Sequence, residues 1–307
     1  MVQKNPLKII EIPVVLNAKT VIEVIGKFNT FLESPDTRVA INFSKMEKAE
    51  PGGLTTLLCY LRDLPRIKNN FRGLIIHSND KDAEEQIARM GFYNMLGVSD
   101  DFEWNKEEIE LYKELYCFNK TTPDEEVISV NEKIIYSFAK TSNNDNYKKA
   151  ISWCILELVD NAKIHSHSDE CVLFAQKRER GNYTEFCIAD RGLGIQKTMG
   201  DNDIVSALQR CISPEKGVHS KGMGNGLYFT SELIKRDKSA ANSSLTIWSG
   251  NAMLTVTSGN EPVTTKTDSY WQGTVVTLTL SNNIQSSIEI IKGSEVELTE
   301  ELPNFYC

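Results

Sequence analysis

The sequence predicts an α+β protein built from two domains, and the chain length and the patterning of each half support this. The chain has 307 residues, enough for two domains of the usual size, each able to bury a core. Strand-like and helix-like segments alternate from residue 7 to residue 97, whereas the second half combines helices with strands of alternating apolar and polar residues. We therefore expect a small sheet covered by helices, followed by a unit of helices and antiparallel sheet.

The first half is expected to alternate strands and helices. Its predicted elements are a strand-like segment at 7–16, a helix from 17 to about 32, a strand at 38–43, a helix at 52–67, a strand at 72–77 and a helix at 80–90. Asn17 is a candidate N-cap for the first helix, and Gly91 closes the third. Pro65 is awkward inside the second helix because proline lacks an amide hydrogen, and it favours an earlier end there.

Seven acidic side chains mark residues 99–122 as a connector between the halves. We expect a solvated charged segment, such as a surface helix, in preference to a partner site. The second half then predicts a strand or helix followed by a helix at 124–141, a helix at 146–166, strands at 171–178 and 184–190, a polar stretch at 195–221, a helix at 227–236, and strands at 244–249, 253–257 and 274–280. The predicted domain boundaries are 1–98 for the first domain, 99–122 for the connector, 123–282 for the second domain and 283–307 for an acidic tail.

Charge and composition argue against several classes of protein. The net charge is −8 at pH 7 and the pI is about 5.2, which is unsuited to a chain built mainly to bind nucleic acid. No apolar run approaches the ~18 residues of a membrane span, and the N-terminus lacks the long apolar stretch of a signal peptide. Seven cysteines occur without a CxxC pair, so we expect free thiols and a cytoplasmic location.

The first chemical motif is formed by Glu157 and Asn161, four residues apart in the helix predicted at 146–166. At that spacing they lie on one face of the helix, one turn from each other. A carboxylate can take a proton from water or a hydroxyl, and an amide oxygen can bind a hard cation, so the pair suits metal-assisted phosphate chemistry. The pattern is common by chance, and its weight comes from two glycine-rich segments downstream.

The first of these segments follows the strand predicted at 184–190 and contains Asp190, Gly192 and Gly194. The glycines allow a tight turn and close approach of a ligand, and an ionised aspartate can accept a hydrogen bond from an exocyclic amine. By itself the pattern also fits a plain turn after a strand. Thr274, at the start of the last predicted strand, places a hydroxyl that could support the aspartate or the ligand.

The second segment precedes the helix predicted at 227–236 and contains Lys221, Gly222, Gly224 and Gly226. Backbone N–H groups of such a loop, together with the helix N-terminus, form an anion site suited to phosphates. Lys221 adds a point charge. The loop lacks the GK[ST] ending of a Walker A motif, so it predicts phosphate binding of another kind.

In this order the four motifs resemble the ATP-binding domains of the GHKL superfamily, the group of DNA gyrase, Hsp90, MutL and the sensor histidine kinases. The resemblance implies ATP and Mg²⁺ as ligands and a Bergerat-type α/β sandwich as the fold. By this resemblance Glu157 matches the proton acceptor, Asn161 the magnesium ligand, and Asp190 the residue that recognises the adenine amino group. Gly192 and Gly194 match the turn beneath the base.

The resemblance covers roughly residues 125–282. Residues 196–221 match the lid over the phosphates, and Thr274 matches a hydroxyl that supports the adenine pocket. The phosphate-contacting loop matches Gly222, Gly224 and Gly226. The anti-sigma-factor serine kinases of this superfamily carry a histidine four residues beyond the asparagine, as His165 does here, although His165 also fits a polar residue ending a helix. Histidine-kinase activity is not expected, because only His77 lies upstream and it falls on a predicted strand.

The first half resembles, less closely, a STAS domain, the fold of anti-sigma-factor antagonists. The matching segment is 39–61, in which a strand, a loop and a helix follow one another. In signalling members this loop carries a phosphorylatable serine, whereas residues 50–53 here read Glu-Pro-Gly-Gly and have no acceptor hydroxyl. This departure argues against regulation by phosphorylation at the loop. Another small α/β module is the alternative for this half.

The sequence thus predicts a Mg-ATP-binding regulatory protein with ATPase or protein serine/threonine kinase activity of the anti-sigma-factor kinase type. The alternative is a nucleotide-gated protein-binding module with negligible turnover. A DNA-repair or topology ATPase is disfavoured, because only about 25 weakly patterned residues follow the ATPase-like segment. We expect a protein partner or a dimer mate. A covalent tether would hold the two halves at an effective concentration of about millimolar, so the first domain is expected to pack on the second, or on a dimer mate, and to govern lid closure.

Overall fold

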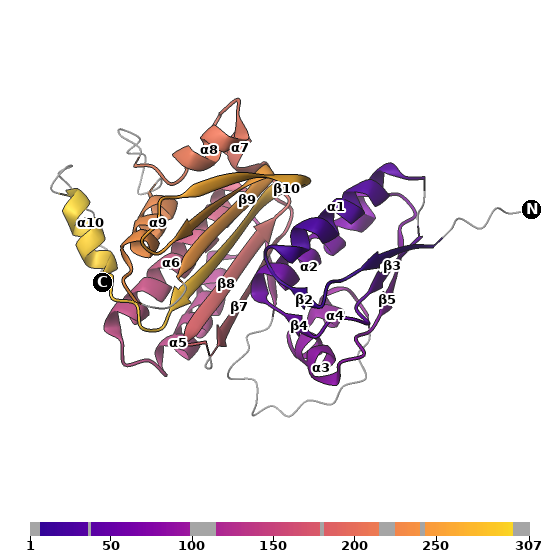
Figure 1. The fold of residues 1–307 in the computed structure, drawn as a ribbon, viewed down its shortest axis with the longest axis horizontal. Helices are drawn as coiled ribbons and strands as arrows, with labels where there is room; N and C mark the ends of the chain where they lie inside the picture. Colours follow the sequence, from indigo (N-terminus) through magenta and orange to yellow (C-terminus); the bar gives the residue numbers. More distant parts are fainter. Residues whose placement is uncertain are drawn as a thin grey trace, which may run out of the picture.

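The computed structural model describes residues 7–35, 38–98, 115–178, 181–214, 225–239 and 243–296, with side chains described as far as residue 292. Helices and strands mix as an α+β protein requires. Figure 1 shows the layers: a small sheet, then the helices α1 and α2, then a larger sheet whose far face carries further helices.

The small sheet is parallel, with strand order β1-β3-β5. Its strands are β1 (Lys8–Glu11), β3 (Arg38–Asn42) and β5 (Arg72–Ile76), and β2 (Val15–Leu16) pairs with β4 (Lys48–Ala49) beside it. The helices of this half are α1 (Thr20–Glu33), α2 (Pro51–Ile67), α3 (Lys81–Arg89) and α4 (Phe92–Met95). The predicted alternation of strands and helices in the first half is therefore confirmed.

Local chemistry explains where these helices begin and end. The Asn17 side-chain oxygen accepts hydrogen bonds from the backbone N–H groups of Lys19 and Thr20, at 2.9 and 3.0 Å, which satisfies amides at the start of α1. The expectation that Pro65 shortens the second helix is wrong, because α2 continues to Ile67. Proline costs a helix one hydrogen bond, and close to the C-terminal end that loss is offset by tertiary packing.

The larger sheet is antiparallel, with strand order β6-β7-β8-β10-β9. Its strands are β6 (Tyr116–Phe118), β7 (Cys171–Arg178), β8 (Tyr183–Asp190), β9 (Ser244–Thr257) and β10 (Val263–Ser281). One face carries α5 (Asp124–Ala139), α6 (Asp145–His165) and α9 (Gly226–Arg236), while α7 (Gly194–Thr198) and α8 (Ile204–Arg210) lie against β9 and β10. The last helix, α10 (Ile288–Val296), packs on α6 and α9.

Several elements of this half differ from the sequence-based expectations. The two strands expected at 244–249 and 253–257 are one strand, β9, and β10 begins eleven residues before the strand expected at 274–280. The end of the expected connector forms β6, which pairs with β7. The stretch expected to be polar and irregular contains α7 and α8, and the expected tail contains α10.

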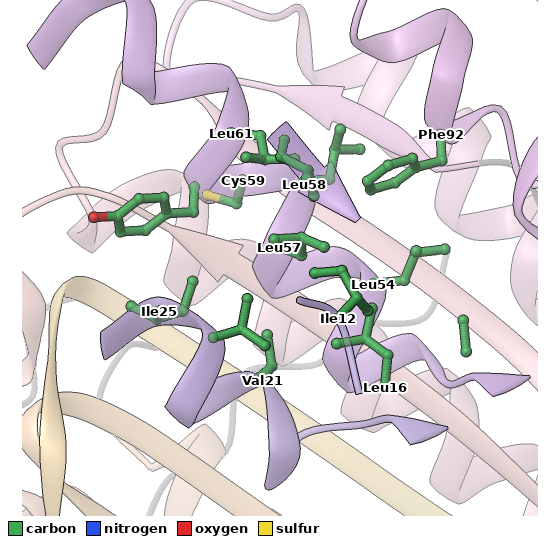
Figure 2. Close-up of a cluster of buried hydrophobic side chains, with 14 of the residues drawn as sticks. Ile12, Leu16, Val21, Ile25, Leu54, Leu57, Leu58, Cys59, Leu61 and Phe92 are labelled. Carbon is green, nitrogen blue, oxygen red and sulfur yellow. The ribbon is translucent and has the colours of Figure 1, made fainter. Parts of the chain in front are cut away.

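The two halves share one apolar core, because α1 and α2 fill the face of the larger sheet opposite α6 and α9. Every residue of α2 from Pro51 to Leu61 is buried, as expected for a helix enclosed between two sheets. Figure 2 shows Leu54, Leu57 and Leu58 of α2 within this cluster. Each such leucine stabilises the fold by roughly 1.5–3 kcal/mol on burial. The same cluster takes in side chains of the larger sheet, namely Val172, Phe174, Cys187, Ala189, Trp248, Trp271 and Val275.

Candidate functional site

A cavity of about 350 Å³ opens between helix α6, the centre of the larger sheet and the start of α9. Four of the residues singled out from the sequence line it, although they come from four different elements: Asn161, Asp190, Gly226 and Thr274. The rest of the lining is largely apolar, with Leu158, Ala162, Ile164, Ile188, Ile195, Met199, Leu227 and Val276. A largely apolar cavity with a few convergent polar groups is the usual form of a small-molecule site.

Helix α6 positions the first motif. Its N-cap is Asn144, whose side-chain oxygen accepts from the backbone N–H of Tyr147 at 3.3 Å. A stripe of buried side chains then anchors the helix on the sheet, namely Ala150, Ile151, Cys154, Ile155, Leu158 and Val159. Glu157 and Asn161 lie one turn apart near this stripe, as their spacing predicts.

Asp190 lines the cavity, and the residue is only 4% exposed to solvent. Asp190 is the last residue of β8, and in the antiparallel register it faces Thr274 on β10. Its Oδ1 accepts a hydrogen bond of 2.8 Å from the backbone N–H of Gly192. Burial raises the pKa of Asp190 to about 7, while the hydrogen bonds from the backbone of Gly192 and Thr274 act in the opposite direction.

The turn after Asp190 tolerates only glycine at two positions. A Cβ at Gly192 would lie 1.8 Å from the carbonyl oxygen of Ser166, so the backbones touch there. Gly194 has a φ of 76°, in the left-handed region that glycine favours. Gly273 adds a third close approach, because its φ is 103° and a Cβ would lie 2.2 Å from the carbonyl oxygen of Asp190. The turn is therefore held with little freedom.

Glu157 lies beside the first residue of α9. A Cβ at Gly226 would be 2.0 Å from Oε2 of Glu157, so any side chain at this point would displace the carboxyl group. Burial, helped by the nearby charge of Asp160, raises the pKa of Glu157 to about 7, against the opposing effect of the ammonium of Lys292. A carboxyl group with a pKa near neutrality can accept a proton at physiological pH.

The structure adds residues to the site that the motifs do not contain. His165 and Ser166 line the cavity beyond Asn161, and burial lowers the pKa of His165. Arg210, which pairs with Asp201 at 2.9 Å, comes from α8. His165 was visible in the sequence as the residue one turn after Asn161, whereas nothing in the sequence marked α8.

Two further polar groups lie next to α6 and α9, the helices that contribute Asn161 and Gly226 to the cavity. The side-chain oxygen of Asn225, just before α9, is buried and finds no hydrogen-bond partner among the described residues. Lys292 of α10 lies with its Nζ 3.5 Å from the ring centroid of Trp153, one turn before Glu157. Asn225 lies within the glycine-rich segment but was not singled out, and Lys292 falls in the stretch expected to be an acidic tail.

Part of the predicted phosphate loop lies outside the described residues, namely Lys221, Gly222 and Gly224. Within the described part of the chain, no group of three or more His, Cys, Asp or Glu side chains could hold a metal ion by itself. The oxygen donors present, the amide of Asn161 and the carboxylate of Glu157, are of the kind that Mg²⁺ accepts. It commonly takes one or two protein ligands and completes its shell with phosphate and water oxygens.

Comparison with known proteins leaves the site to be interpreted from its geometry. No protein-family model matches this chain, and no curated protein matches it at a significant level. Among the described helices, none is both long and apolar enough to span a bilayer.

Proposed function

We propose that the chain binds Mg-ATP in the cavity between α6 and the larger sheet, and that it hydrolyses ATP or transfers its terminal phosphate. The observation that carries the proposal is the Asp190 carboxyl group, which is buried, accepts hydrogen bonds from backbone N–H groups and lines a largely apolar cavity. A flat heterocycle fits an apolar cavity, and its exocyclic amine would supply the donor that a buried carboxylate requires.

The placement of the other residues supports the same ligand. Gly226 begins an eleven-residue helix whose N-terminus faces the cavity, where backbone N–H groups and the helix dipole favour phosphate. Asn161, which lines the same cavity from α6, would hold the magnesium ion together with phosphate oxygens. When bound, this ion would neutralise charge that develops on the transferred phosphoryl group.

Glu157 is the residue we assign to the chemical step. In the ionised form its carboxylate would orient and deprotonate a water molecule, or a hydroxyl group of a protein partner, for attack on the terminal phosphate. Its raised pKa of about 7 keeps both protonation states accessible near neutral pH. Ile195, Met199 and Leu227 give the cavity largely apolar walls, which would exclude water from the bound nucleotide and strengthen its polar contacts. Glu157 itself does not line the cavity and lies beside Gly226 at its edge.

The architecture is also part of the proposal. An antiparallel sheet with a nucleotide-sized cavity beneath one helix layer supports the resemblance of residues 125–282 to a GHKL domain of the Bergerat type. The parallel sheet and helices of residues 7–98 are consistent with a STAS-like unit. Both identifications rest on the arrangement of elements and motifs.

One observation favours the alternative of a nucleotide-gated binding module with negligible turnover. The loop that would carry a phosphate acceptor in a STAS-like unit has no hydroxyl group, and its Gly52 is buried against Glu185 of β8. Transfer of phosphate to this loop in the same chain is therefore disfavoured. Hydrolysis, or transfer to another protein, remains the leading form of the proposal.

Calorimetry of the full chain with Mg-ATP tests the binding proposal. Asp190→Asn should abolish or strongly weaken binding, whereas Asp237→Asn is a matched control. Asp237 is also a buried aspartate, 3% exposed, but its carboxylate bonds to Ser239 and Ser243 away from the cavity. Equal binding by the two variants, or no uptake by the wild type, would overturn the proposal.

A single-turnover assay with labelled ATP then separates chemistry from binding alone. Phosphate release that disappears in Glu157→Gln while ATP affinity is retained supports the enzyme. Tight binding by the wild type with no release supports the binding module.

A further inference from the structure

The side chain of Arg191 connects the cavity to the first half of the chain. Arg191 stands between Asp190 and Gly192 in the tight turn, yet it is not among the residues that line the cavity. Its Nε donates a hydrogen bond of 3.0 Å to Oδ2 of Asp63 on α2. The side chains of Arg191 and Asp63 are only 11% and 19% exposed. A partly buried, hydrogen-bonded pair is screened far less by solvent than a surface ion pair.

Aromatic rings fix the guanidinium group from two sides. The guanidinium carbon of Arg191 lies 4.5 Å from the ring centroid of Tyr60, on α2, and 5.2 Å from that of Trp271, on β10. Both distances are within the range of cation–π attraction. The same Trp271 donates from Nε1 to the carbonyl oxygen of Asp190 at 2.9 Å. One cluster therefore holds both the side chain of Arg191 and the backbone of its neighbour.

The remaining bonds of the turn come from the second half itself. Ser168 Oγ accepts from the backbone N–H of Arg191 at 3.3 Å, and the carbonyl oxygen of Gly192 accepts from Gln272 at 2.6 Å. These groups belong to the loop after α6 and to β10, so they would be present without the first half. At this point the first half adds the contacts of Asp63 and Tyr60 with Arg191, together with a hydrogen bond of 3.6 Å from Cys59 Sγ to the carbonyl oxygen of Ala189.

The charged groups around Arg191 are matched in pairs, which argues against a second ligand site there. Three ion pairs join α2 to the second half: Arg62 with Glu170, Arg66 with Asp169, and Asp63 with Arg191. They surround a small polar cavity of about 50 Å³. Since each charge has its partner, the cluster acts as a joint between the halves.

We propose that Asp63 and Tyr60 of α2 are positioning residues, which hold the Asp190 turn in its ligand-binding geometry through the side chain of Arg191. The first half of the chain thereby sets the ligand affinity of the cavity in the second half. The claim that the ligand is a nucleotide rests on the proposed function, whereas the positioning of the turn does not. The turn has little tolerance for displacement, because Gly192 already touches the carbonyl oxygen of Ser166 and any shift moves the carboxyl group of Asp190.

The first arm of the test needs no nucleotide. Hydrogen exchange of the full chain is followed in the peptide covering residues 188–195, whose amides of Gly192 and Leu193 bond to Asp190 Oδ1 and to the carbonyl oxygen of Ser166. Asp63→Ala should speed exchange of these amides by about fivefold or more, with β9 unchanged. Arg66→Ala is the control, because it removes another ion pair of α2 that does not touch the turn. Equal exchange of this peptide in the two variants overturns the proposal.

The second arm measures nucleotide affinity. Asp63→Ala should weaken Mg-ATP binding by about fivefold or more and reduce the preference for ATP over GTP, whereas Arg66→Ala should leave both unchanged. Asp63→Asn keeps an oxygen that can accept from Arg191 and should fall between wild type and Asp63→Ala. Equal ATP affinity in wild type and Asp63→Ala overturns the positioning role but leaves the proposed function standing. If hydrogen exchange of residues 188–195 is faster in Asp63→Ala but the wild type binds no ATP, the positioning role is supported and the proposed function is wrong.

Discussion

The carboxylate of Glu185, on β8, accepts a hydrogen bond of 2.9 Å from the backbone N–H of Gly52, in the first turn of α2. The residue is only 5% exposed. It thus places an acid at the positive end of the helix that both sheets enclose, where the helix dipole favours it. Burial nevertheless dominates, and with the charge of Glu50 it raises the pKa of Glu185 to about 7 against the bond from Gly52 and the charges of Arg178 and Lys48.

This contact predicts a pH-dependent stability. Because the pKa of Glu185 is higher in the folded chain than its ordinary value of 4.5, the folded state binds the proton more tightly, and stability falls as pH rises from about 4.5 to about 7. The rise corresponds to about 3 kcal/mol. Glu185→Gln keeps an oxygen that can accept from Gly52, so it should raise the free energy of unfolding at pH 8 by roughly 1–3 kcal/mol.

The measurement is urea unfolding of wild type and variant at pH 5 and pH 8. Other buried acids also titrate in this range, so the informative quantity is the difference between the two proteins. A difference that does not change with pH would contradict the assignment.

Glu157 predicts the pH dependence of turnover. If the ionised form is the base, kcat/KM should increase with pH and level off above an apparent pKa of about 7. Lys292→Ala removes the positive charge that lowers the pKa of Glu157, so the increase of kcat/KM should occur at higher pH. Steady-state ATPase profiles of the two proteins give the answer. If the increase of kcat/KM occurs at the same or a lower pH in Lys292→Ala, Lys292 does not lower the pKa of Glu157.

Asp190 predicts the pH dependence of binding. A carboxylate accepts from an exocyclic amine, so Mg-ATP affinity should increase as pH rises through about 7, with release of a fraction of a proton at neutral pH. GTP presents a carbonyl oxygen at the corresponding position of the base, so its affinity should not follow this trend. Calorimetry in two buffers of different ionisation enthalpy measures the proton release. Asp237→Asn, which leaves the carboxyl group of Asp190 in place, serves as the control that should show the same release as the wild type.

The substitution Gly226→Ala is predicted to lower activity without lowering stability. Alanine is favoured over glycine within helices by about 1 kcal/mol, but the new Cβ would lie 2.0 Å from Oε2 of Glu157. The carboxylate must then rotate away. Gly226→Ala should therefore leave the melting temperature near that of the wild type while lowering kcat by at least about tenfold. A variant with full turnover would show that Glu157 is not needed at its observed position.

Local motifs predicted part of the cavity lining, whereas Glu157, Gly192 and Gly194 lie beside the cavity without lining it. Asn161, Asp190, Gly226 and Thr274 were selected by spacing and by their place at the ends of predicted elements, and the structure brings all four to one cavity. The pairing of Asp63 with Arg191 was not predictable in this way, because the two are 128 residues apart and no periodicity relates them.

The secondary-structure elements that the sequence did not predict were missed because they show little apolar patterning of their own. The first part of β10, residues 263–273, is polar and bulged, and in this part it pairs with β9 alone, so it shows no apolar alternation. Among the residues of α10 whose side chains are described, Ile288 and Ile291 are buried and hold the helix on the domain, whereas Ile290 is exposed, so no clear apolar stripe marks the helix. Thr55 and Thr56 fall within the helix expected at 52–67, but their complete burial follows from the second sheet lying against that helix.

The position of α2 between two sheets has a consequence for biosynthesis. Its residues leave the ribosome about 200 residues before β10, which completes the surface that covers them. At about 5–20 residues per second the nascent helix waits roughly 10–40 s with one apolar side uncovered. Truncated or stalled chains that end before β10 should consequently be recognised by chaperones that bind exposed leucine-rich segments, whereas the finished chain keeps the buried part of that helix, Pro51 to Leu61, covered.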